Sequence, residues 1–193
     1  VDAGKFKDIV GLDNIAAPQN VQTVDTVVPT IAITNDAGGS ANVNTGAVTY
    51  TFTLSKGSST FAPSDITVVG GIKAGTFATG LTGDSLYTLL ITPDANSTTN
   101  MTVDVLSGAF TDAVGNNNTT ATQNVQAVDT VSPSLVIADN TAGTATGDVT
   151  YTFTLSEANT TFAIGVIYVV GVTKAVTFAS GVIGERGCNI IFH

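Results

Sequence analysis

The chain has no tryptophan, a single cysteine, a single histidine and only 6 basic residues against 15 acidic ones. A lone cysteine, Cys188, cannot form a disulfide within the chain, so we expect a small buried hydrophobic residue or, alternatively, an intermolecular bridge. The formal net charge of −9 opposes binding to nucleic acid or to an anionic membrane surface and favours divalent cations as partners. The sequence also lacks an apolar run of about 18 residues, so it predicts no membrane-spanning helix.

Residues that could form catalytic machinery are equally scarce. A Ser/His/Asp or Cys/His site would have to use His193, the last residue, where a preorganised geometry is not expected. Asp84 and Asp94 fall in predicted loops, and Glu157 and Glu185 are isolated, so no pair of carboxyl groups is placed for acid and base catalysis. We therefore predict that the protein is not an enzyme.

What the chain has instead is an internal repeat. The sequence Val-Thr-Tyr-Thr-Phe-Thr-Leu-Ser occupies residues 48–55 and returns unchanged at residues 149–156. Apolar and polar residues alternate in it, which is typical of a half-buried strand with one face on a core and a threonine-rich face toward solvent. Residues 4–25 also match residues 108–129. The chain is therefore an array of related segments.

The repeat divides the chain into three parts. Residues 1–23 are predicted as the closing strand or strands of a preceding or neighbouring repeat, residues 24–127 as a complete repeat, and residues 128–193 as an incomplete repeat that lacks its last strands. The complete repeat has seven predicted strands, which glycine, proline, aspartate and asparagine turns separate: residues 31–33, 48–55, 66–69, 74–79, 86–92, 101–106 and 120–125. This pattern predicts an all-β fold of tandem immunoglobulin-like β-sandwiches, one complete and one or two partial.

Three motifs carry a resemblance to a known family. They are Val-Asp-Thr-Val-x-Pro at residues 24–29, Tyr-Thr-Phe-Thr-Leu-Ser at residues 50–55 and Phe-Thr-Asp-Ala-Val-Gly-Asn at residues 110–116. Together they resemble the bacterial Ig-like repeats of large surface adhesins and biofilm-associated proteins, over the whole chain except the part after residue 181. The resemblance implies an extracellular or cell-surface, non-enzymatic, rod-forming module, often stiffened by calcium at the joins between domains. Relatives usually carry more aspartate at those joins than this chain does.

Oxygen ligands for a metal gather at the joins between repeats. Asp25 and Asp129 lie in the joins, and Asp112 and Asn116 lie in the loop before the last strand. An immunoglobulin-like topology places this loop at the same end as the start of the first strand, so we expect Asp112 near Asp25. These oxygens would suit calcium, and in a composite of two copies Asp8 would take the place of Asp112 beside Asp129. The alternative is that Asp112 and Asn116 are turn residues and Asp25 is solvated.

Two structural functions fit these features. The chain could be a stalk segment of an adhesin, with flanking repeats of the same chain as its partners. It could also build a surface fibre by head-to-tail strand complementation, in which residues 1–23 of one copy complete residues 128–193 of the next. A carbohydrate- or ice-binding module is a third possibility. The absence of tryptophan and the short threonine row of the repeated strand disfavour it.

Overall fold

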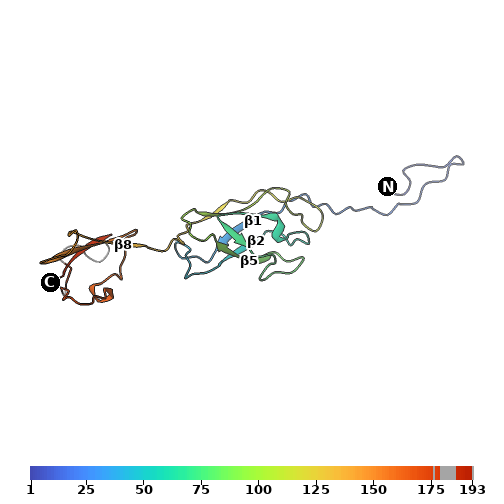
Figure 1. Ribbon diagram of the computed structural model, residues 1–193. Helices are drawn as coiled ribbons and strands as arrows, with labels where there is room; N and C mark the ends of the chain where they lie inside the picture. Colours follow the sequence, from blue (N-terminus) through green and yellow to red (C-terminus); the bar gives the residue numbers. More distant parts are fainter. Residues whose placement is uncertain (176, 179–185, 193) are drawn as a thin grey trace. The chain divides into compact units, whose positions relative to one another are not determined.

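The computed structural model describes residues 1–175, 177–178 and 186–192. Its regular structure consists of β-strands and two short 3₁₀ helices, so the predicted all-β fold is confirmed. The chain forms two compact units, Val1–Asp129 and Thr130–His193, here called unit 1 and unit 2 (Figure 1). Glu185 and His193, two titratable residues considered above, lie outside the described residues.

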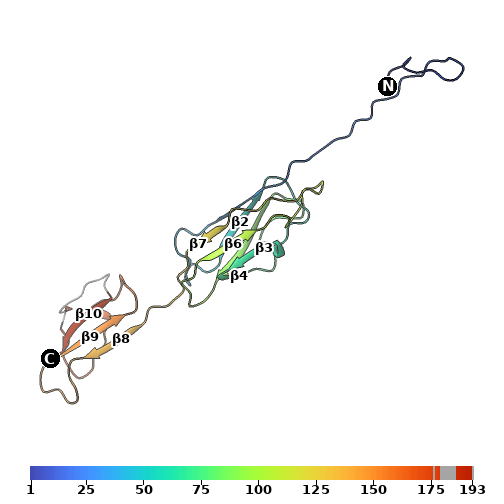
Figure 2. The same cartoon turned by 90° about the horizontal axis from the view of Figure 1, so that it is seen from above.

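Unit 1 contains two antiparallel sheets. The first has the order β1-β2-β5-β4 and the second has the order β3-β6-β7 (Figure 2). This is the strand arrangement of a constant-type immunoglobulin domain, so the predicted sandwich is present. The strands are β1 (Ile31–Asn35), β2 (Val48–Leu54), β3 (Ile66–Val69), β4 (Gly71–Lys73), β5 (Leu86–Pro93), β6 (Met101–Val105) and β7 (Asn124–Gln126).

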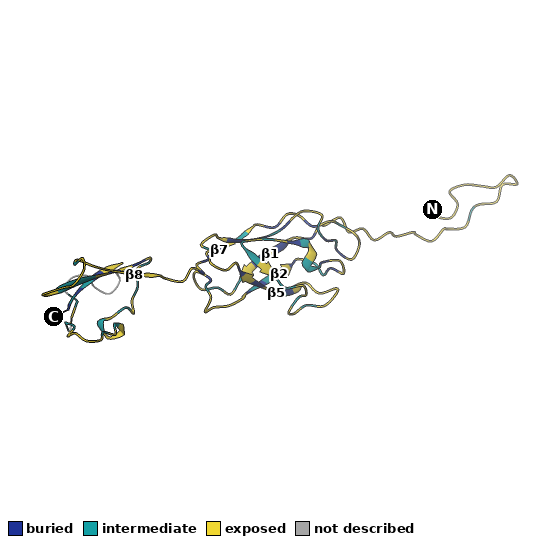
Figure 3. Ribbon diagram, viewed as in Figure 1, coloured by how far each residue is buried: buried dark blue, intermediate teal, exposed yellow. Residues whose placement is uncertain are grey.

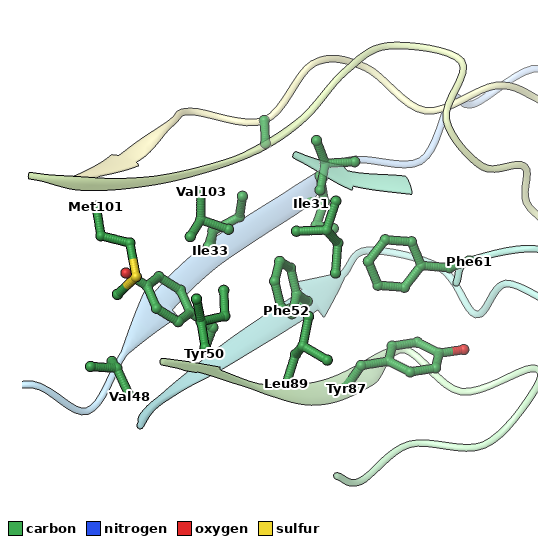
Figure 4. Close-up of a cluster of buried hydrophobic side chains, with 14 of the residues drawn as sticks. Ile31, Ile33, Val48, Tyr50, Phe52, Phe61, Tyr87, Leu89, Met101 and Val103 are labelled. Atoms are coloured by element: carbon green, nitrogen blue, oxygen red, sulfur yellow. The ribbon is translucent and has the colours of Figure 1, made fainter. Parts of the chain in front are cut away.

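The core of unit 1 follows from the alternation in β2. Tyr50 and Phe52 have no exposed surface, while the intervening threonines face outward. Met101 and Val103 point from β6 toward this face and close the core from the second sheet (Figure 4). Each such side chain contributes about 1.5–3 kcal/mol through the apolar surface that it removes from water.

Two predicted strands lie elsewhere than expected. The strand predicted at residues 74–79 is wrong, because the chain turns at Gly70 and the edge strand β4 begins at the next residue. Gly70 has a φ of 76°, and a Cβ atom there would lie 2.9 Å from the Asn100 carbonyl oxygen, so this turn requires glycine. The closing strand predicted at residues 120–125 begins later, at Asn124. Ala121 already donates its N–H to the Val105 carbonyl of β6 at 2.9 Å, but the regular ladder with β6 begins only at Asn124.

Between β2 and β3 the chain forms a single turn of 3₁₀ helix, η1 (Pro63–Asp65). The carboxylate of Asp65 accepts a hydrogen bond from the N–H of Ala62 at 2.8 Å and closes this turn. Lys73 donates to the carbonyl oxygens of Pro63 and Ile66, which ties the edge strand to η1.

Unit 2 has one sheet among its described residues, in the order β10-β9-β8. Cys188 of β10 pairs with Phe153 of β9 as Tyr87 of β5 pairs with Phe52 of β2, so β10 is the counterpart of β5. Cys188 is buried, as expected for a small hydrophobic residue, and burial raises the pKa of its thiol. The elements are β8 (Leu135–Asp139), β9 (Val149–Leu155), the 3₁₀ helix η2 (Ile164–Val166) and β10 (Gly187–Phe192).

Residues 1–28 carry almost no buried surface (Figure 3). They include a short hairpin in which Lys7 and Asp13 form an isolated antiparallel bridge and an ion pair with an Nζ to Oδ1 distance of 2.5 Å. The hairpin is held by its own hydrogen bonds and not by a core.

Candidate functional site

The charged cluster of unit 1 is centred on Lys56, which directly follows the repeated strand. Its Nζ atom donates to both carboxylate oxygens of Asp25 at 2.9 Å and to Oδ2 of Asp112 at 2.9 Å. It also donates to the carbonyl of Val27. Asp25 and Val27 lie on the segment that leads into β1, and Asp112 lies in the loop before β7. The expected proximity of Asp112 to Asp25 is therefore confirmed, and an ammonium group lies between them.

Asn116 joins the cluster through its amide nitrogen. Nδ2 donates to the Asp25 carbonyl at 3.1 Å and to Oδ2 of Asp112 at 3.0 Å. Oδ1 of Asp112 accepts the backbone N–H groups of Val114 at 3.1 Å and of Asn116 at 2.9 Å, which is the hydrogen bonding of a turn residue. Asp112 therefore stabilises its own loop through Oδ1 and binds Lys56 through Oδ2.

The electrostatics of the cluster follow from these contacts. The Lys56 ammonium holds the pKa of Asp112 well below its usual range, with a smaller contribution from Asn116. Lys56 also lowers the pKa of Asp25, and the two carboxylates raise the pKa of Lys56. Because the Asp112 side chain is only 3% exposed, its negative charge requires this compensation. The sequence analysis missed Lys56, although one of only 6 basic residues directly follows the repeated strand.

The other two predicted metal ligands lie apart from this cluster. Asp129 follows β7, and its N–H donates to the Ala41 carbonyl at 2.9 Å. Asp8 lies in the N-terminal hairpin, where Oδ1 accepts the N–H groups of Val10 at 2.9 Å and Leu12 at 3.0 Å. Within the described part of the chain, no three or more His, Cys, Asp or Glu side chains are grouped so that they could hold a metal ion.

Unit 2 carries a groove with a volume of about 360 Å³. Its walls include Ile137 of β8, Tyr151 of β9, Phe192 of β10 and, after η2, Ile167 and Val169. In unit 1, Met101 and Val103 belong to β6, the strand beside β3 in the second sheet, and they share one core with the residues that correspond to these walls. The groove is therefore the part of an immunoglobulin-like core that β6 fills in unit 1.

Residues 25–128 match the bacterial Ig-like domain family. The chain belongs to this family. The match begins at Asp25 and spans β1 to β7, so the predicted resemblance is confirmed over the complete repeat. Neither a curated protein nor a solved structure matches the chain.

Bacterial Ig-like domains are typically non-enzymatic, suggest a structural or adhesin-type module and are often surface-exposed. Asp84, which the sequence places in a loop, accepts the N–H of Leu81 through Oδ2 at 2.7 Å and closes a turn. No helix in the part of the chain that the structure describes has the length and apolar character needed to cross a membrane.

Proposed function

We propose that this protein is an extracellular structural module in which bacterial Ig-like units follow one another along the chain and form a stalk or a fibre at the cell surface. The observation that carries the proposal is the Lys56 cluster. Lys56 ties the segment at Asp25 and Val27 to the loop at Asp112, so the chain is held to the sandwich several residues before β1 begins. When the segment that enters a unit is held against that unit, the join bends less, and an array of such units is stiffer.

The stiffness can be measured by the backbone order of residues 25–28. We expect ¹⁵N relaxation to give these residues the order of β1 in the native protein and a lower order in Lys56→Met. Lys5→Met is the matched control, because Lys5 lies in the exposed N-terminal hairpin. Equal order in Lys56→Met and in the native protein would contradict the proposal. Antibodies against residues 25–128 should also label intact cells of the source; labelling only after permeabilisation would contradict a surface location.

Calcium at the second join stays a prediction, whereas the Lys56 cluster opposes calcium at the first join. The carboxylates of Asp25 and Asp112 already accept hydrogen bonds from Lys56, so these residues do not fit a calcium ion while the lysine holds its place. The sequence at the next join differs, because Asp129 there accompanies Glu157 at the position that corresponds to Lys56. In thermal unfolding with and without chelator, we expect the transition of unit 1 to be unchanged. A chelator-sensitive midpoint for unit 1 would contradict this expectation.

Fibre formation by strand complementation is the second form of the proposed module. It is supported by the groove of unit 2 and by the exposed apolar side chains of residues 1–28. Sedimentation of the full chain separates the forms, because a stalk segment stays monomeric and a fibre subunit associates as its concentration rises.

The alternative of an ice- or carbohydrate-binding face would rest on a short row of threonines. Thr34, Thr51, Thr88 and Thr79 lie side by side across the outer face of the first sheet. The row is broken in unit 2, where Ala138 and Asn189 flank Thr152. Thermal hysteresis and glycan-array binding test this face, and we expect neither.

A further inference from the structure

The strand that occurs twice has the composition of a segment that associates with itself. β2 and β9 both read Val-Thr-Tyr-Thr-Phe-Thr-Leu, and a serine follows each of them. These residues include no charge, no proline and no glycine, and all except the leucine and the serine are β-branched or aromatic. Strands of this composition stack on copies of themselves in a cross-β arrangement, with about 4.7 Å between neighbouring strands.

The folded chain protects both copies of the strand. β2 lies between β1 and β5, and β9 lies between β8 and β10 (Figure 2). Each copy therefore has hydrogen-bonded neighbours on both of its edges. A strand without a free edge cannot add a strand of another chain. The repeated strand becomes available to a second copy only when its sheet opens.

Other strands of unit 1 contain residues that discourage such stacking. β4 includes Lys73, β5 includes Pro93 and β6 includes Asp104. A charge that recurs on every strand of a stack is repelled by its neighbours, and proline has no N–H for the ladder. The repeated strand has neither, and an opened chain presents it twice.

The residues that flank the two copies differ in charge. Lys56 follows the segment in unit 1, whereas Glu157 follows it in unit 2. In front of the segment, Ala47 of unit 1 corresponds to Asp148 of unit 2. A parallel, in-register pair of β2 and β9 would therefore place Lys56 opposite Glu157 and Ala47 opposite Asp148. The two segments match in every side chain and attract at one end.

Pairs of like copies lack this match. Two β2 segments in the same parallel register place Lys56 beside Lys56. Two β9 segments place Glu157 beside Glu157 and Asp148 beside Asp148. Like charges directly opposite one another destabilise a strand pair. The flanking charges therefore favour a stack in which β2 and β9 alternate.

We propose that, when a sheet opens, β2 of one copy pairs in parallel with β9 of a second copy, and that these mixed pairs grow into a cross-β stack. The partner is another copy of this chain, which is recognised by the repeated strand and by the opposite charge that follows it. Each chain carries both segments, so the contact is heterologous and propagates. The proposal goes beyond the stalk or fibre of folded units, because it needs no folded unit.

Assembly of the full chain from the unfolded state tests the proposal. The chain is unfolded in urea and then diluted to a urea concentration just above the unfolding midpoints of both units, so that variants of different native stability start alike. We expect fibres that bind thioflavin T and diffract at spacings of about 4.7 and 10 Å. Chains that stay soluble over about 1–200 µM would overturn the proposal and leave the stalk function standing.

Lysines on the outer face of the strand test whether the repeated segment drives the assembly. Thr53 and Thr154 are exposed in the folded units. Thr53→Lys combined with Thr154→Lys places a like charge on every strand of the stack and should lengthen the lag time about tenfold. The matched control is Thr34→Lys combined with Ala138→Lys, which adds the same charge to the exposed face of the neighbouring strands. Equal lag times for the two double variants would overturn the role of the segment.

Charge reversal tests the pairing of β2 with β9. Lys56→Glu and Glu157→Lys each place like charges opposite one another in the mixed stack, so each should lengthen the lag time severalfold although they change the net charge in opposite directions. Combining both reversals restores opposite charges and should restore the native lag time. These differences should disappear in about 1 M salt, which screens the charges. A combined variant as slow as Lys56→Glu would overturn the mixed parallel pairing.

Discussion

Units 1 and 2 contain the same seven-residue strand in different surroundings. β2 and β9 have identical sequences, and each pairs with its neighbours in the same register. Yet Ile33, beside β2, is 9% exposed, whereas its counterpart Ile137, beside β9, is 55% exposed. The strand sequence and its pairing residues determine the local sheet. Burial depends on the second sheet, which residues far along the chain supply.

The units also differ in the charge of the residue that follows the repeated strand. Lys73 and Lys174 do the same work in both units, since each donates to two carbonyl oxygens at the 3₁₀ helix before it. Lys56, in contrast, is replaced by Glu157 in unit 2. The lysine that braces the edge of the sheet is present in both units, whereas the lysine that braces the incoming chain of unit 1 is a glutamate in unit 2.

The largest expected effect is on the aromatic core. Phe52→Ala should lower the free energy of unfolding of unit 1 by about 3–5 kcal/mol, because it leaves a cavity under β6. Phe153→Ala should cost unit 2 less, because Phe153 lines the groove of unit 2 and its neighbours can collapse into the space. Denaturant unfolding followed separately in the two units measures both. Thr53→Ala, on the exposed face of β2, is the control and should change little. Equal losses in both units would contradict the comparison.

The sequence predicts much of this fold, because alternation and turn residues are local signals. The period of residues 48–55 was sufficient to place Tyr50 and Phe52 in the core. The edge strand could not be placed in the same way, since its start depends on how closely Gly70 approaches the distant Asn100. At the site, topology predicts that Asp112 lies near Asp25. The contacts of Lys56 could not be predicted in this way. They depend on where its long side chain reaches at the end of the sandwich, and the alternation of residues along a strand carries no information about that.

A smaller effect is expected at the charged cluster. Lys56→Met should lower the thermal midpoint of unit 1 by several degrees, because it leaves Asp112 buried without its ammonium partner. Adding Asp112→Asn to this variant should recover part of the loss, since asparagine keeps the turn without the charge. Calorimetry of the two single variants and of the double variant gives the coupling. Strictly additive losses would show that Lys56 and Asp112 do not stabilise the unit as a pair.

The smallest expected effect is the loss of thermal stability of unit 1 at acid pH. The folded-state pKa of Asp112 is lowered mainly by Lys56, so its contribution to stability is present above the unfolded pKa of about 4 and is lost as the pH falls toward the folded value. The midpoint of unit 1 should therefore be flat between about pH 7 and 5 and fall below about pH 4. In Lys56→Met the fall should be shallower but not absent, because the pKa of Asp36 is also lowered, by hydrogen bonds from Thr49. Asp36→Asn separates the two contributions. If the thermal midpoints of the native protein and of Lys56→Met fall in parallel below about pH 4, the low pKa of Asp112 does not depend on the lysine. The difference between unit 1, with Lys56, and unit 2, with Glu157, would then have no electrostatic basis.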